Sequence, residues 1–374
     1  MLLDRIFHYT IYLTSLLFWL VIVVILFSGE VYGSGKFLSK VQPIPFELDD
    51  SLTQVRDKIA ENGYNFRVAD NWVVRLPAQL RQQMRTYHFA ESPVTGVEVL
   101  SQNLDMGPLL YCLGPPLPDH FDLRNVAPGR SYIGPIRQQG SCGDCYAFGA
   151  CAAAEGTYNL ATGRYNRDCV DFSEACLAFC LDSFYEGFEG CVGSDYDYRE
   201  LDAMIEKGVC FERQMPYDPF ETSCSSSPRR AYKMFSSWHR IPCSDITAIK
   251  TAIRYFGVVD VAVLTNPAFD AYAGGIYEDS MTDCVGEDEY ADTCCYAPTD
   301  HVVALVGWDD NGGDGYWILR NSWGSKWGEA GYMRIKYHSA HVACAACYLV
   351  YNENNIYARR GRGVVPVLQL LLAD

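Results

Sequence analysis

Positive charge is scarce in this 374-residue sequence, in which 30 Lys and Arg residues stand against 46 Asp and Glu residues. The formal net charge of −16 argues against nucleic acid or an anionic membrane surface as the main partner, because both would repel the chain. No Asn-x-Ser/Thr sequence occurs, so we expect no N-linked sugar. About half of the residues (49%) are hydrophobic, which is enough to build one large domain or two ordinary ones.

Cysteine, in contrast, is abundant. Sixteen cysteines are too many for a cytosolic enzyme of this size unless it binds metal, and disulfides in an oxidising compartment are the simpler explanation. A metal site would have to use a late group of residues: Cys294, Cys295, His338, His341, Cys344 and Cys347. A Cys-x-x-Cys pair without a matching partner in this region is weak evidence for zinc. We therefore expect extra disulfides, no metal and no other cofactor.

Residues 6–27 are almost wholly apolar and, as a helix, would be long enough to cross the ~30 Å hydrocarbon core of a bilayer. This run is long for the apolar part of a signal peptide, but small residues within 28–33 offer a cleavage site. We interpret residues 1–29 as either a cleaved signal peptide or a retained signal anchor that tethers the protein to a membrane. Both alternatives direct the remaining chain into the secretory pathway, in agreement with its cysteines.

The pattern of the remaining chain changes from helical to strand-like near Tyr232. We expect helices within 50–63, 78–85, 146–155, 175–181 and 201–207, and strands within 258–264, 302–308, 315–320 and 331–337. The fold class is therefore predicted to be α+β. Residues 30–116, which end in a Gly-Pro-rich turn, form a separate segment that is either a propeptide or a small accessory domain that stays attached.

One stretch carries a nucleophile signal. Residues 138–148 read Gln-Gln-Gly-Ser-Cys-Gly-Asp-Cys-Tyr-Ala-Phe, and they pass from a loop into a helix that begins near Cys145. The partial positive charge at a helix N-terminus favours a thiolate, which is a nucleophile. Downstream, His301 begins an apolar strand, and Asn321 lies twenty residues further in the run Arg-Asn-Ser-Trp-Gly. A thiol, an imidazole and an amide are the parts of a nucleophilic catalyst.

The order Gln139, Cys145, His301, Asn321, with these local sequences, resembles the papain-like cysteine proteases, among them the lysosomal cathepsins. The resemblance implies a two-lobed fold, with a mainly helical lobe at 117–231, a mainly β lobe at 232–354, a tail at 355–374 and the active site between the lobes. It implies that Cys145 is the nucleophile, His301 the base and Asn321 its orienting group. Gln139 then contributes to the oxyanion hole, and Trp323 shields the His–Asn hydrogen bond.

The same resemblance assigns further roles. The run at 117–125, Leu-Pro-Asp-His-Phe-Asp-Leu-Arg-Asn, is similar to the mature N-terminus of the family, so 30–116 is expected to be an inhibitory propeptide, most similar to the cathepsin B type. The residues implied in substrate binding are Gly193, Ser194, Ala262, Thr299 and Asp300, with Leu349 as a less secure addition. The implied disulfides are Cys142–Cys191, Cys180–Cys224 and, more weakly, Cys284–Cys344.

Several positions depart from the family pattern. Tyr146 replaces the usual tryptophan, as in cathepsin C, and Ser194 replaces a glycine. Asp144 places a carboxylate beside the nucleophile, which would raise the pKa of the thiol unless it points to solvent. The histidine-bearing insertion that makes cathepsin B a carboxypeptidase is absent between Cys191 and Cys224. An open-ended cleft implies an endopeptidase, although the unusual insertion at 279–297 precedes His301 and could reach the cleft.

We therefore predict a papain-like cysteine endopeptidase made as a zymogen, acting in a lysosome- or vacuole-like acidic compartment or outside the cell. Its expected partners are polypeptide substrates and its own propeptide. Two alternatives stay open. One is a catalytically silent homologue that binds peptides in the same cleft, and the other is a disulfide-rich, membrane-tethered adhesion protein.

Overall fold

The computed structural model describes residues 43–85, 116–181, 190–194, 199–220, 224, 231–241, 245–280, 299–310 and 314–352. The chain divides into two units, Met1–Pro43 and Ile44–Asp374, and every element described below belongs to the second. The apolar run 6–27, much of the insertion 279–297 and the tail 355–374 lie outside the described residues. Within the part that is described, no helix is long and apolar enough to span a bilayer.

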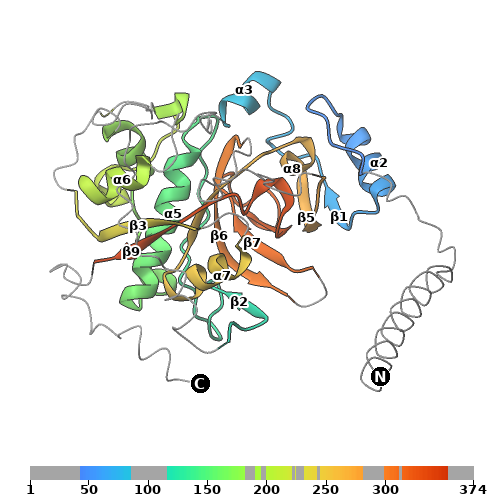
Figure 1. Ribbon diagram of the computed structural model, residues 1–374. Helices are drawn as coiled ribbons and strands as arrows, with labels where there is room; N and C mark the ends of the chain where they lie inside the picture. The colour runs from blue at the N-terminus through green and yellow to red at the C-terminus, as the bar shows by residue number, and fades with distance from the viewer. Residues whose placement is uncertain are drawn as a thin grey trace, which may run out of the picture. The chain divides into compact units, whose positions relative to one another are not determined.

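The architecture is α+β, as the sequence predicts (Figure 1). The α-helices are α2 (Leu52–Asn62), α3 (Ala78–Gln83), α5 (Cys145–Thr162), α6 (Arg199–Glu206), α7 (Ile246–Tyr255) and α8 (Pro267–Asp270). The strands are β1 (Phe66–Val68), β2 (His120–Asp122), β3 (Phe235–Ile241), β4 (Val259–Val263), β5 (Tyr272–Tyr277), β6 (His301–Asp309), β7 (Tyr316–Arg320), β8 (Tyr332–Lys336) and β9 (Ala345–Tyr351). The predicted helix within 175–181 is a short π-helical segment, Cys176–Cys180.

Helix α5 is the central helix of the fold and is longer than the sequence pattern predicts. Every residue from its start at Cys145 to Leu160 is buried, because small side chains let the sheet approach closely. A Cβ atom at Gly156 would lie 2.1 Å from a methyl carbon of Val258. The helix ends at Gly163, which adopts the left-handed conformation that glycine tolerates best. Its contacts with β4, β6 and β9 hold the start of the helix against the sheet.

The strands form one sheet in the order β1-β5-β8-β7-β6-β4-β9-β3, and β2 also pairs with β6. All pairs are antiparallel except β5 with β8. Strand β6 is buried from His301 to Trp308, as its uninterrupted apolar sequence indicates. The predicted strand at 302–308 is therefore an inner strand of the sheet. Strand β6 begins one residue earlier, at His301, which pairs with Val263 of β4.

Residues 44–85 pack against the domain that follows them. Helix α2 begins at a capping box formed by Ser51 and Gln54 and ends at the left-handed Gly63, close to its predicted limits. Strand β1 then pairs antiparallel with β5, and α2 contacts α8. In Figure 1 these elements, drawn in blue, lie beside α8 and β5. The segment therefore extends the sheet at its β5 edge.

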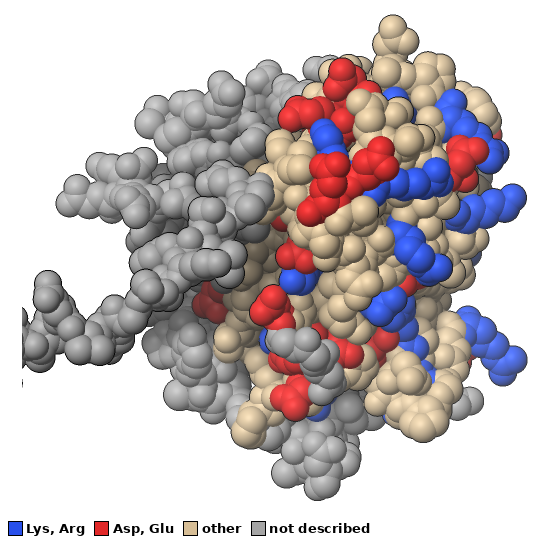
Figure 2. Space-filling view, turned by 90° about the vertical axis from the view of Figure 1, so that its right-hand side faces the viewer, with Lys and Arg blue, Asp and Glu red and all other residues tan. Residues whose placement is uncertain are grey.

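Charges of both signs are interspersed on the face shown in Figure 2, where no single-sign field dominates. Ion pairs of the described residues include Arg334 with Glu329 and Lys336 with Glu278. The negative net charge of the sequence is therefore not concentrated on this face.

Candidate active site

Cys145 is the first residue of α5 and is completely buried. Burial raises the pKa of its thiol, and the nearby carboxylates of Asp144 and Asp300 raise it further, against the opposing effect of backbone hydrogen bonds from Val302 and Tyr146. The hydrogen bond from Val302 places the sulfur beside the residue that follows His301. In this covered state the structure favours the neutral thiol.

His301 is held by two neighbours. Its Nε2 lies 2.9 Å from Oδ1 of Asn321, and its ring stacks on Trp323 with 4.7 Å between ring centroids. Asn321 Oδ1 also accepts a hydrogen bond from the backbone N–H of Ser322, so this atom is an acceptor and His301 Nε2 carries the hydrogen. Nδ1 of His301 has no hydrogen-bond partner among the described residues. In a neutral ring, Nδ1 is therefore the atom that can accept a proton.

The charge state differs from that of a thiolate–imidazolium pair. Burial, opposed by the hydrogen bond to Asn321 and assisted by the positive charge of Arg85, lowers the pKa of His301 to about 3. The helix N-terminus was expected to favour the thiolate, but desolvation outweighs this effect while residues 44–85 are in place. The ion pair stays a prediction for the uncovered cleft.

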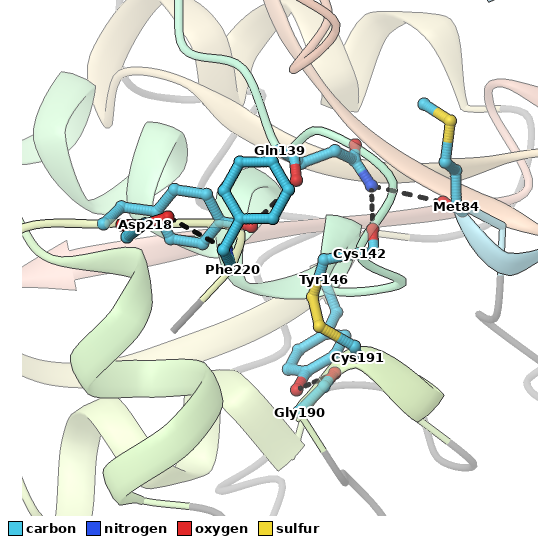
Figure 3. The surroundings of a disulfide bond; sticks show 9 residues. Met84, Gln139, Cys142, Tyr146, Gly190, Cys191, Asp218 and Phe220 are labelled. Atoms are coloured by element: carbon cyan, nitrogen blue, oxygen red, sulfur yellow. Dashed lines mark hydrogen bonds between the residues drawn. A yellow bond between two sulfur atoms is a disulfide. The ribbon is translucent and has the colours of Figure 1, made fainter. Parts of the chain in front are cut away.

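Both polar atoms of the Gln139 side chain form hydrogen bonds. Figure 3 shows the two that its amide nitrogen donates, to Met84 and to Cys142. Its Oε1 accepts from Oγ of Ser322 at 2.6 Å, and its Nε2 donates to the carbonyl of Cys142 at 2.8 Å. Nε2 also donates to the carbonyl of Met84 at 3.2 Å. The amide that was predicted to stabilise an oxyanion therefore donates a hydrogen bond to a backbone carbonyl of the N-terminal segment.

The candidate substrate-binding residues fall into two groups. Gly193 and Ser194 are buried and follow Cys191, whose disulfide with Cys142 joins them to the nucleophile loop. Ala262, Thr299 and Asp300 surround the start of β6: Ala262 pairs with Val302, and Asp300 accepts hydrogen bonds from the N–H and Oγ1 of Thr265. Leu349 is buried on β9 opposite Trp238, where it belongs to the core.

The disulfides Cys142–Cys191 and Cys180–Cys224 join the two pairs that the resemblance implied. A third, Cys176–Cys210, was not foreseen. Cys344 is disulfide-bonded, but Cys284 lies outside the described residues, so their pairing stays a prediction. No group of His, Cys, Asp and Glu in the described part of the chain could hold a metal ion.

Sequence reasoning missed four residues at this site. Ser322 orients Gln139, Met84 presents its carbonyl to the same amide, and Arg85 forms a buried ion pair with Asp270. Ser322 directly follows Asn321 in the sequence, and this position could have identified it as a residue of the site. No sequence signal connects Arg85 with Asp270, because the two residues lie in segments that meet only in the folded chain.

Comparison with known proteins identifies the family to which most of the chain is similar. Residues 117–352 match the family described as papain family cysteine protease. Germination-specific cysteine protease 1 of Arabidopsis thaliana is 32% identical over 235 residues, which are 63% of this chain and 56% of that protein. Cathepsin S of Rattus norvegicus is 28% identical over 239 residues, which are 63% of this chain and 66% of that protein. The chain spans 45% to 64% of the length of four plant and crustacean relatives.

Solved structures show the same fold. Digestive procathepsin L 3 of Tenebrio molitor larval midgut has a TM-score of 0.60 and 24% identity, and the match covers 80% of this chain and 87% of that chain. At this identity the likeness concerns the fold alone. Together with the family match over residues 117–352, it shows that the chain belongs to the papain family of cysteine proteases.

Proposed function

We propose that the protein is a cysteine endopeptidase made as a zymogen, with residues 30–116 as its inhibitory propeptide and 117–374 as its catalytic domain. The observation that carries the proposal is the hydrogen bond from Gln139 Nε2 to the carbonyl of Met84. The Met84 carbonyl accepts a hydrogen bond from the amide that would stabilise the oxyanion of a substrate. Met84 belongs to the segment that precedes the family domain. This segment is held in place by Trp72, whose Nε1 donates to the carbonyl of Trp323 at 2.8 Å.

In the proposed mechanism, Nδ1 of His301 takes the proton of Cys145, and the thiolate attacks the carbonyl carbon of the peptide bond. Gln139 Nε2 and the backbone N–H of Cys145 stabilise the oxyanion. His301 then gives its proton to the leaving amine, and a thioester remains. Water, deprotonated by the neutral imidazole, hydrolyses the thioester and regenerates the thiol. The hydrogen bond to Asn321 occupies Nε2, so Nδ1 remains the atom that can take the proton.

Endopeptidase action is supported by the sequence between Cys191 and Cys224, which has no histidine. It therefore lacks the histidine-bearing insertion that makes cathepsin B a carboxypeptidase. An acidic compartment or the extracellular space is supported by the disulfides Cys142–Cys191, Cys176–Cys210 and Cys180–Cys224, which persist under oxidising conditions. The proposed tether at 6–27 would place the enzyme at a membrane surface.

The test is labelling of the acid-incubated full chain with a thiol-reactive peptide epoxide, followed by mass mapping. We expect one label at Cys145, loss of residues before Leu117 and cleavage inside a peptide with blocked ends. Cys145→Ala is the control for the label, and Cys151→Ala, a change at a buried cysteine within the same helix, should leave the labelling intact. Absence of a label in trimmed, disulfide-bonded protein would favour the silent peptide-binding homologue instead.

A further inference from the structure

Asp270 is a buried carboxylate at the end of α8, and it is only 1% exposed. Its backbone carbonyl accepts hydrogen bonds from Nε1 of Trp327 at 3.0 Å and from Nδ2 of Asn71 at 2.8 Å. The Trp327 contact comes from the catalytic domain itself. The contact with Trp327 therefore remains when the N-terminal segment leaves. With that segment in place, water is largely excluded from the Asp270 side chain.

Both cations that pair with Asp270 come from the N-terminal segment. Arg85 contacts its Oδ1, and Nη1 of Arg81 lies 3.8 Å from its Oδ2. Among the described residues of 117–352, no Lys, Arg or His forms an ion pair with Asp270. Removal of the propeptide would take away both countercharges of this carboxylate, so that it either becomes protonated or pairs with another cation in the place of Arg85.

The position of Arg85 shows which part of the cleft the pair occupies. Arg85 directly follows Met84, whose carbonyl accepts from Gln139 Nε2, and its charge acts on His301. Phe269, the neighbour of Asp270, packs edge-on against Trp323, which stacks on His301. Asp270 therefore lies on the imidazole side of the cleft. In the proposed mechanism His301 gives its proton to the leaving amine, so the first residue after the cleaved bond lies on that side.

We propose that Asp270 forms an acidic subsite that binds an arginine side chain in the first substrate residue after the cleaved bond. The proposal rests on the protease function proposed above, and the propeptide's Arg85 occupies this subsite in the zymogen. A planar guanidinium suits a buried carboxylate better than an ammonium does, because it can offer two parallel N–H donors and is more weakly hydrated. Lysine should therefore be accepted less well than arginine, and glutamate should be rejected.

The experiment uses enzyme matured from the full chain and four internally quenched peptides that differ only in the residue after the cleaved bond: arginine, lysine, norleucine or glutamate. We expect kcat/KM to be about tenfold or more higher for arginine than for norleucine, with glutamate lowest. Asp270→Asn should reduce the arginine-to-norleucine ratio to near one. Glu278→Gln removes one negative charge from the same lobe and should keep the ratio of the unaltered enzyme.

Equal rates for arginine and norleucine in the unaltered enzyme would overturn the subsite and leave the protease function standing. A ratio that survives Asp270→Asn would overturn the role of this carboxylate. If Asp270→Asn does not fold, the four-peptide series on the unaltered enzyme still decides. No cleavage of any peptide, together with no epoxide label at Cys145, would overturn the proposed function and the subsite with it.

Discussion

The side chain of Gln139 is held in one orientation by its neighbours. Ser322 and the carbonyl of Cys142 hold the two ends of its amide, so the N–H that meets the Met84 carbonyl does not need to reorient. Donors that are already aligned stabilise a developing negative charge more strongly than donors that must move. The preceding residue, Gln138, forms a backbone β-bridge with Trp323. We assign it no part in stabilising an oxyanion.

Replacing Gln139 with alanine should lower kcat by about 10²–10³, because one oxyanion donor is lost. KM should change much less, since the donor acts mainly on the transition state. Steady-state kinetics on a blocked peptide substrate measures both quantities. Gln138→Ala is the matched control and should keep kcat within about twofold. A similar loss in both variants would point to damage of the loop rather than to loss of a donor.

Asp144 is a second residue with a local effect on the nucleophile. It precedes Cys145, and burial raises its pKa to about 7, against the opposing effect of the neighbouring Tyr217 hydroxyl. Above that pH the carboxylate is ionised and raises the pKa of the Cys145 thiol. Below that pH it is protonated, and this effect disappears.

Asp144→Asn should therefore speed the alkylation of Cys145 in the matured enzyme at pH 7.5 by up to roughly tenfold, which is one pKa unit of thiol activation. At pH 5 the rate should hardly change, because Asp144 is already neutral there. Alkylation rates between pH 4 and 9 give the comparison, with the exposed carboxylate variant Asp218→Asn as control. An equal acceleration at both pH values would contradict a charge effect.

At the scale of elements, the pairing of β1 with β5 joins the N-terminal segment to the part of the chain that matches the papain family. Phe66 lies opposite Gly275, where a Cβ atom would come within 2.7 Å of the Phe66 Cα, so glycine permits the close approach of the two strands. The ring of Phe66 packs on Tyr277 with 4.9 Å between ring centroids, and Phe66 is only 5% exposed. One aromatic side chain thus anchors a short strand of three residues.

Phe66→Ala should loosen this attachment, because truncation of a buried aromatic anchor at an interface costs about 2 kcal/mol or more. We expect the full-length zymogen to be labelled by the peptide epoxide at neutral pH at least tenfold faster than the unaltered chain. Arg56→Ala on the exposed face of α2 should label at the unaltered rate. An unchanged rate in Phe66→Ala would show that β1 does not control access to Cys145.

At the scale of the whole molecule, buried carboxyl groups lie at several points between α5 and the sheet. Burial raises the pKa of Asp144 and Glu155 to about 7 and that of Asp300 to about 6, and it raises the pKa of Glu174 and Asp260 as well. Unfolded Asp and Glu titrate near pH 4. Between about pH 4 and pH 7 the folded chain therefore holds more protons than the unfolded chain.

The free energy of unfolding should consequently fall as the pH rises through this window, because the folded state must release protons that it binds more tightly. In the Cys145→Ala zymogen, which does not process itself, Tm should be about 5 °C or more higher at pH 5 than at pH 7.5. Calorimetry under non-reducing conditions tests this, and Asp144→Asn should show a smaller difference. A Tm that rises steadily from pH 5 to pH 7.5 would contradict the prediction.

The sequence by itself determined the family, the α+β class and the order of Gln139, Cys145, His301 and Asn321, because these features are encoded in short local patterns. Helix limits such as Ser51 and Gly63 were readable for the same reason: capping depends on neighbouring residues. Strands β3 and β9 were not identified individually, since their partners lie far away along the chain.

Only the tertiary structure decided the charge state of the site and the contacts of the N-terminal segment with it. The neutral form of Cys145 follows from complete burial, which no local pattern reports, and it outweighs the helix N-terminus that the sequence does reveal. The pairing of Arg85 with Asp270 has no periodicity and no motif, because it exists only where two distant segments meet. Local patterns therefore determined which groups take part, and long-range packing determined their electrostatic environment.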